Sequence, residues 1–197
     1  MKVRPAGRSQ RGWRLAAAVL AALTVLGSAP GARAQRPSQD EVEAAYLYNF
    51  GKFVRWPETE GQGALRICVA GSDGFEQTVS RLVAGEQIAN RPVEVRRAEG
   101  PEDTAGCSIL FVGGMETARE DAFLGATAGK PVLTVGEARD FLSRGGMIEF
   151  VPVEDHVRFA VNLDAANRSG VGLSSELLKV AVSVTGKPEK AGKGGAQ

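Results

Sequence analysis

The stretch LRICVA at residues 65–70, followed by GSDG at residues 71–74, decides the fold. A short apolar run that ends in glycine and aspartate is typical of a buried strand that leads into a helix. Phe75, Val79 and Leu82 then recur at the spacing of one helix face. The stretch therefore predicts a strand followed by a helix, which is the repeating unit of an α/β domain.

The same alternation continues toward the C-terminus. We expect further strands around Val93 and Val95, at 108–112 and at 131–135, and helices at 115–126 and 136–144. Residues 147–153 and 157–163 flank a Glu154-Asp155 turn and predict a hairpin, Asp164 is expected to cap a turn, and Ser174 is expected to cap a last helix. The fold class is therefore α/β, a mainly parallel sheet with helices on both faces and a C-terminal antiparallel hairpin.

A helix is also expected near the start of the domain. SQDE at residues 38–41 is a capping box, with its serine at the N-cap and its glutamate three residues later. Apolar and aromatic residues follow at helical spacing, and Trp56-Pro57 ends the run. The spacing predicts that Tyr46 packs in the core and that Tyr48 is exposed.

Residues 1–34 have the pattern of a cleaved signal peptide. Basic residues precede an apolar run from Leu15 to Leu26, and Ala32-Arg33-Ala34 is a small-x-small cleavage pattern. The alternative, a membrane anchor, needs roughly 20 apolar residues, so we expect export to a bacterial periplasm without membrane insertion. The mature chain from Gln35 would have a formal charge of minus five, because the signal removes six basic residues and no acid. We expect no binding to nucleic acid, because the chain has no basic stripe.

Cys68 and Cys107 are the two cysteines of the sequence. In an oxidising compartment an even count predicts a disulfide, and closing a loop of about 40 residues stabilises a fold by roughly 4 kcal/mol in the chain-entropy model. The alternative is two buried free thiols. A bridge between neighbouring parallel strands would also require Cys107 to lie in the loop before its strand. Two cysteines and the single histidine, His156, do not make a zinc ligand set, and we expect no cofactor.

The rest of the sequence favours a non-enzymatic domain. His156 lies in the predicted hairpin turn, and no G-x-S-x-G nucleophile motif is present. The glycine-rich 71–74 stretch could offer backbone N–H groups to an anion, but an ordinary strand-to-helix turn is the simpler interpretation. We expect one domain over residues 35–185, a disordered tail over residues 186–197, and no enzymatic activity.

Several stretches together resemble the YfiR-like periplasmic family. AAYLYNF at residues 44–50, KFV at 52–54 and WP at 56–57 look like the opening of that family. The likeness continues with PVLTVG at 131–136, Phe141, GGMI at 145–148, VRFAVNL at 157–163 and LSSELLK at 173–179. It spans about residues 42–184, and the ordered set is specific although no single piece is.

The resemblance implies a small periplasmic regulator. Such a protein binds the periplasmic sensor region of an inner-membrane diguanylate cyclase and represses it, which lowers cyclic-di-GMP and biofilm formation. Disulfide state tunes this role in relatives, and some relatives carry a second cysteine pair, so here only Cys68 and Cys107 are available for redox switching. Other members occur beside other membrane partners such as sensor kinases, and a homodimer is a further assembly to consider.

Two classes of function remain open at this point. A protein-binding regulator would use the first helix or the hairpin, and we take Tyr48, Lys52 and Trp56 as its candidate contacts. A small-molecule-binding sensor module would use Arg158 and Asn162 as polar anchors, because residues four apart in a strand point to the same face. Plain solvent exposure is the simpler interpretation of that pair. An adjacent gene for a membrane cyclase would favour the first class.

Overall fold

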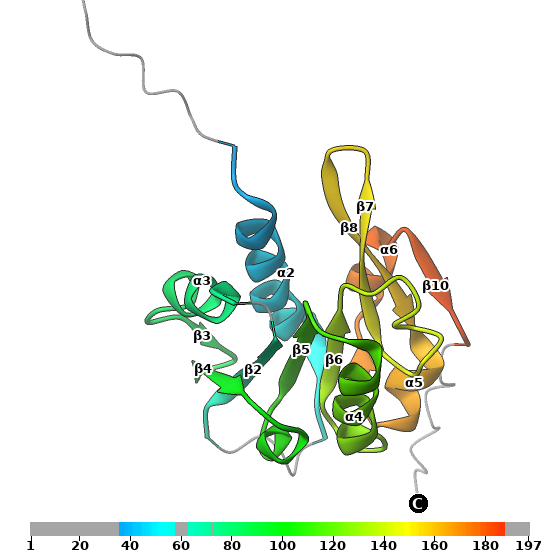
Figure 1. The fold of residues 1–197 in the computed structure, drawn as a ribbon, viewed down its shortest axis with the longest axis horizontal. Coiled ribbons are helices and arrows are strands. Elements are labelled where there is room, and N and C mark those ends of the chain that lie inside the picture. The colour runs from blue at the N-terminus through cyan, green and yellow to red at the C-terminus, as the bar shows by residue number, and fades with distance from the viewer. Residues whose placement is uncertain (1–35, 58–62, 72, 188–197) are drawn as a thin grey trace, which may run out of the picture. The chain divides into compact units, whose positions relative to one another are not determined.

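A central sheet carries helices on both of its faces (Figure 1). The structure is a computed structural model and describes residues 36–57, 63–71 and 73–187. The predicted signal peptide and most of the predicted tail lie outside these ranges. In chain order the elements are α2 (Gln39–Phe53), β1 (Val54–Arg55), β2 (Leu65–Gly71), α3 (Phe75–Leu82), β3 (Gln87–Ile88), β4 (Arg91–Ala98), η2 (Pro101–Thr104), β5 (Ile109–Gly113), α4 (Thr117–Thr127), β6 (Leu133–Gly136), β7 (Ile148–Val153), β8 (His156–Asn162), α5 (Leu163–Arg168), β9 (Gly172–Leu173), α6 (Ser175–Val180) and β10 (Ser183–Thr185).

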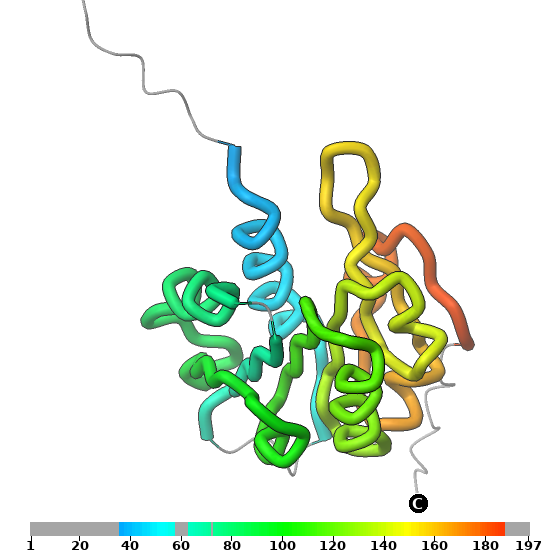
Figure 2. Tube along the Cα trace, in the orientation of Figure 1, coloured from blue at the N-terminus to red at the C-terminus, as the bar shows by residue number. Residues whose placement is uncertain are grey.

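The strand order of the sheet is β10-β8-β7-β6-β5-β2-β4-β3. The strands β4, β2, β5, β6 and β7 run parallel. Strand β8 pairs antiparallel with β7, and β10 lies parallel to β8 at one edge of the sheet. The β7–β8 hairpin projects beyond the neighbouring strands (Figure 2). The predicted fold class is therefore confirmed, and β10 and β3 are short edge strands that the sequence did not indicate.

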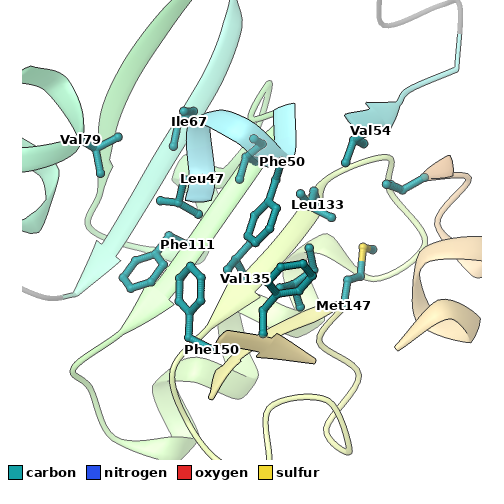
Figure 3. Close-up of a cluster of buried hydrophobic side chains, with 14 of the residues drawn as sticks. Leu47, Phe50, Val54, Ile67, Val79, Phe111, Leu133, Val135, Met147 and Phe150 are labelled. Atoms are coloured by element: carbon teal, nitrogen blue, oxygen red, sulfur yellow. The ribbon is translucent and has the colours of Figure 1, made fainter. Parts of the chain in front are cut away.

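The two faces of the sheet bury separate apolar clusters. Ile67 and Phe111 belong to the larger cluster, which Leu47 and Phe50 of α2 complete (Figure 3). The alternate strand residues, such as Leu110, point to the other face and belong to the smaller cluster under α4. A parallel sheet that is covered on both faces buries consecutive residues, which explains the continuous apolar runs in the sequence.

Helix α2 begins at the predicted capping box. Ser38 Oγ accepts the backbone N–H of Glu41 at 3.2 Å, and Glu41 Oε2 accepts the backbone N–H of Ser38 at 2.8 Å. The helix ends at Phe53 because Val54 is extended and pairs with Leu173 of β9 in a separate two-stranded sheet. Strands of two residues are too short to show a periodic pattern in the sequence.

A disulfide holds the short connection between β4 and β5. Only residues 99–108 separate these strands, and they form the single turn η2 where a parallel crossover usually contains a full helix. Cys107 lies in the loop before β5 and is bonded to Cys68 in β2, with the two Cα atoms 5.8 Å apart. The predicted bridge is confirmed, and it ties the crossover loop to the sheet.

The helix expected at residues 136–144 is absent. Gly136 ends β6, and the chain then follows turns as far as Gly146. The Phe141 ring packs so closely on both glycines that a side chain at either position would collide with it. A regular helix would point residues 136 and 141 to different faces, so this tertiary contact overrides the local helical pattern.

The capping predictions near the C-terminus have mixed outcomes. Ser174 is the N-cap of α6, and its Oγ accepts the backbone N–H of Leu177 at 3.2 Å, as predicted. Asp164 is not the cap of the preceding helix. Asn162 takes that position, because its Oδ1 accepts the backbone N–H of Ala165 at 3.0 Å.

Candidate functional site

A groove lies at the amino edge of the parallel strands, where the end of α2 meets the β3–β4 turn. Its volume is about 700 Å³. Apolar and aromatic side chains alternate with cationic ones along its walls. We call it the α2–β3 groove and define it by Lys52, Arg55, Trp56, Leu65, Ile88 and Arg91.

Gly51 brings α2 close to β3 and so forms the floor of the groove. A Cβ atom at Gly51 would lie 2.6 Å from Ile88 Cδ1, so glycine lets the buried Ile88 side chain pack against the helix. The next two residues, Ala89 and Asn90, have φ angles of +51° and +63°, as in a type I′ hairpin turn. Alanine is unfavourable in this conformation, and the turn beside the groove therefore carries backbone strain.

Trp56 has a fixed position in the groove wall. Its indole Nε1–H donates to the carbonyl oxygen of Ser108 at 3.2 Å. Its partly buried ring packs against the larger apolar cluster. Ser108 directly follows the bridged Cys107, so the disulfide and the indole hold the same loop.

Three cationic side chains line the groove. Within the part of the chain that the structure describes, no carboxylate forms an ion pair with Lys52, Arg55 or Arg91. Backbone carbonyls hold the Arg91 guanidinium, since its Nε–H donates to Gly63 at 2.9 Å and an Nη2–H donates to Ala64 at 3.0 Å. These bonds orient Arg91, and among the described residues they are not accompanied by an ion pair to its guanidinium.

Tyr48 lies one helical turn from Lys52 and is partly buried, whereas the helical pattern predicted full exposure. Its hydroxyl donates to the Glu86 carboxylate, and this hydrogen bond raises the pKa of the phenol. The Lys52 ammonium lies 3.9 Å from the Tyr48 ring centroid and donates to Asn49 Oδ1 at 3.2 Å. The sequence did not show that the loop before β3 packs against this side of α2.

Tyr46 is partly buried and packs against the larger apolar cluster, in agreement with the packing that its spacing predicted. Its ring centroid lies 5.7 Å from that of Phe50, 5.9 Å from that of Phe150 and 5.5 Å from that of Phe159. Its hydroxyl donates to the carbonyl oxygen of Val157 at 3.3 Å. The aromatic side of α2 is therefore the contact between this helix and the β7–β8 hairpin.

Arg158 and Asn162 lie outside the groove. Arg158 is exposed on β8, opposite Val151 of β7. Asn162 uses both ends of its side-chain amide within the fold, because Nδ2 donates to the Leu142 carbonyl at 2.9 Å and Oδ1 caps α5. The suggested ligand-anchoring role of the two residues stays a prediction.

The opposite, carboxyl edge of the sheet contains a buried pair of carboxyl groups. Glu43 of α2 is 1% exposed and shares a hydrogen bond with Glu137, which follows β6. Burial, with a smaller contribution from Glu137, raises the pKa of Glu43 to about 8, and burial also raises the pKa of Glu137. Glu43 Oε1 accepts a hydrogen bond from Gln39 at 2.8 Å, and Oε2 has no donor, which is consistent with a proton on Oε2.

A second hollow, of about 870 Å³, lies between α4, the segment before β7 and α5. Leu124 and Met147 contribute apolar lining, and Arg144 and Arg168 contribute positive charge. Three nearby carboxylates form ion pairs with the Arg144 guanidinium. Nowhere in residues 36–57, 63–71 and 73–187 do three His, Cys, Asp or Glu side chains form a group that could hold a metal ion.

The sequence analysis did not identify some of the residues that line the amino edge of the sheet, nor the buried glutamate at its carboxyl edge. Arg91 reaches the groove only because the β3–β4 hairpin packs beside α2, and this long-range contact leaves no local signal. Glu43 had a signal, since it shares the helical stripe of Leu47 and Phe50. A carboxylate in an apolar stripe indicates burial with a shifted pKa.

The fold defines an α/β domain whose parallel core follows the doubly wound order β4-β2-β5-β6. The chain belongs to the YfiR/HmsC-like family, whose model matches residues 40–182. The family resemblance seen in the sequence is thereby confirmed. No helix in the described ranges is long and apolar enough to cross a membrane.

Among solved structures, the chain is similar to a conserved domain protein from Vibrio cholerae, with 12% sequence identity and a TM-score of 0.52. That match covers 75% of this chain and 60% of the other, and it supports the fold alone. The chain is also similar to the ABC domain in complex with L-Trp from Streptococcus pneumonia, with 13% identity and a TM-score of 0.45. That second match covers 61% of this chain and 55% of the other, and it carries no argument about function.

Proposed function

We propose that this protein is a periplasmic regulator that binds the sensor region of an inner-membrane diguanylate cyclase and represses the enzyme. Repression lowers cyclic-di-GMP and, with it, biofilm formation. The observation that carries the proposal is the α2–β3 groove, whose six defining residues include Lys52 and Trp56 from the stretches that resemble the opening of the family. A groove with an ordered indole and three cationic side chains that form no ion pair within the described residues suits recognition of another molecule.

The composition of the groove favours binding over catalysis. Its lining, as far as the structure describes it, includes no serine, cysteine, histidine or carboxylate that could act as a nucleophile or a general base. Aromatic and arginine side chains are enriched among the residues that dominate protein interfaces. The protein would therefore act by holding a partner in one state, without turnover of its own.

The test is a gene deletion in two backgrounds. Deleting the gene should raise cellular cyclic-di-GMP when the partner cyclase is present and should leave it unchanged when the cyclase gene is also deleted. Purified protein should bind the isolated periplasmic region of that cyclase. Unchanged cyclic-di-GMP in a strain with every cyclase intact, together with no binding to any membrane sensor region, would reject the regulator.

The second hollow supports a runner-up, a sensor module for a small molecule that serves another membrane partner such as a sensor kinase. Its volume of about 870 Å³ lies within the usual range of small-ligand pockets. A ligand that raises the unfolding temperature of the wild type but not of Met147→Trp, which would fill the hollow, would favour this second function.

A further inference from the structure

We infer that the α2–β3 groove recognises an acidic peptide segment of the partner protein, with an apolar side chain against Trp56 and carboxylates paired with Arg55 and Lys52. This inference rests on the proposed function, because it names the chemistry of the partner that the regulator would bind. It concerns the groove alone and makes no use of the second hollow.

Charge complementarity is the first argument. The mature chain is acidic overall, with a formal charge of minus five from residue 35 onward, yet three cations meet in this groove. Lys52 keeps N–H donors beyond the one that reaches Asn49, and Arg91 uses two of its five donors on backbone carbonyls. Arg55 is exposed beside them. A negatively charged ligand would therefore be attracted to the groove against the net charge of the domain.

The apolar walls are the second argument, because they distinguish a peptide from a simple anion. Leu65, Ile88 and the Trp56 ring are fixed by core packing. Inorganic phosphate or acetate would leave these walls exposed to water, whereas an apolar side chain would cover them and gain about 25 cal/mol for each Å² buried. The walls therefore favour a ligand with an apolar group between its charges.

The shape of the groove is the third argument. A volume of about 700 Å³ takes a few side chains and excludes a folded domain. Strand β3 is the last strand on this side of the described sheet, so no further strand blocks an extended segment that runs past the groove. An anionic lipid surface is flat and would meet only the rim, where Arg55 lies.

Trp56 allows a direct measurement. Trp13 and Trp56 are the two tryptophans of the sequence, so in the exported form, or in full-length Trp13→Phe, the indole of Trp56 reports on the groove. We would titrate the protein with the blocked peptide EDLEDL and follow tryptophan fluorescence. The expected result is a saturable change that weakens as salt is added, with no change for the charge-reversed peptide KKLKKL.

Two variants provide the matched comparison. Arg55→Glu should weaken binding of EDLEDL by about tenfold, because it removes one ion pair and adds a repulsion. Arg96→Glu makes the same charge change on β4, outside the groove, and should alter binding less than twofold. Equal unfolding temperatures of the two variants and the wild type would show that the difference arises in the groove.

Three results would overturn the inference. The first is no fluorescence change with EDLEDL, and the second is an equal response to inorganic phosphate at the same concentration. The third is tighter binding to anionic phosphatidylserine vesicles than to the peptide, which would identify a membrane surface.

The inference and the proposed function can fail separately. If the Arg55→Glu variant no longer binds the peptide but still represses the cyclase, the groove is not the regulatory contact and the proposed function stands. If gene deletion has no effect on cyclic-di-GMP, the proposed function fails whether or not the peptide binds.

Discussion

The two ends of α2 lie at opposite edges of the same parallel sheet and differ in charge. At the carboxyl edge, Glu43 is buried beside Glu137, and burial raises the pKa of both carboxyl groups. At the amino edge, Lys52 is exposed beside a groove with two arginines. Open α/β sheets usually bind ligands at the carboxyl edge, at the point where the strand order reverses. Here that edge has a shallow hollow of about 520 Å³, and three of its six lining residues are glutamates: Glu116, Glu120 and Glu137.

The strand ends at the reversal point are closely packed. Gly71 and Gly113 end the two strands that flank the reversal point, and a side chain at Gly71 would collide with the Gly113 carbonyl oxygen. A side chain at Gly113 would in turn collide with the Glu137 carboxyl group. The backbone and the Glu137 carboxyl group therefore approach each other closely at the reversal point, beside the acidic hollow. The two edges differ in the sign of their charge, which strand order alone does not predict.

The largest expected effect concerns the disulfide, which supports the amino edge through the loop that carries Ser108. Replacing both cysteines, Cys68→Ser with Cys107→Ser, should lower the free energy of unfolding by about 4 kcal/mol in the chain-entropy model. Urea unfolding under non-reducing conditions measures this change. The reduced wild type is the control and should match the variant. An unchanged urea midpoint would mean that the bridge does not support the fold.

The next effect separates the two tyrosines in the middle of α2. Tyr46→Ala should cost about 3 kcal/mol, because it removes a ring that contacts three other aromatic rings. Tyr48→Ala should cost about 1 kcal/mol and should weaken repression of the cyclase, since Tyr48 lies next to the groove. Denaturant unfolding and cellular cyclic-di-GMP are the two measurements. If Tyr48→Ala unfolds the domain as strongly as Tyr46→Ala, Tyr48 is not an interface residue.

The carboxyl edge predicts a dependence of stability on pH. The pKa of Glu43 is about 8 in the folded state and 4.5 as the ordinary value, so the folded state holds an extra proton between these values. The contribution of Glu43 to stability is full below about pH 4.5 and is lost as the pH rises through about 8, with a slope of at most about 1.4 kcal/mol per pH unit. Chemical denaturation from pH 5 to pH 9 measures this slope.

Two substitutions test that assignment. Glu43→Gln keeps a neutral hydrogen-bonding group and should flatten the profile while it stabilises the protein above pH 8. Asp155→Asn, in the exposed hairpin turn, is the matched control and should keep the slope of the wild type. A slope that survives in Glu43→Gln would place the titrating group elsewhere.

The smallest effect is expected at the strained turn beside the groove. Ala89→Gly should stabilise the protein by about 0.5 kcal/mol, because relief from the left-handed conformation exceeds the added entropy of the unfolded chain. Ala105 is exposed with a φ of −61°, so Ala105→Gly has the entropy cost alone and should destabilise. The unfolding temperature should rise for Ala89→Gly and fall for Ala105→Gly. A shift in the same direction for both variants would exclude strain at Ala89.

Local patterns predicted the parts of the fold that local physics determines. The capping box at residues 38–41, the cap at Ser174, the buried strands and the hairpin follow from residues near each other in the chain. The absent helix at 136–144 depends on Phe141 packing against two glycines, and the cap at Asn162 competes with Asp164 two residues later. Of the groove, the family motif supplied Lys52 and Trp56. Arg91 could not be assigned to it, since no local pattern reports that its strand lies beside α2.

The aromatic contact between α2 and the hairpin also affects the order of folding. The Phe50 ring stacks on the Phe150 ring, with centroids 6.1 Å apart, although the two residues are one hundred positions apart in the chain. Contacts of such long sequence separation slow folding, because the entropy of closing the loop is lost before the contact forms. During synthesis the apolar side of α2 therefore stays uncovered until the β7–β8 hairpin has been made. For the export that the sequence predicts, such a delay would favour translocation of the chain before it folds.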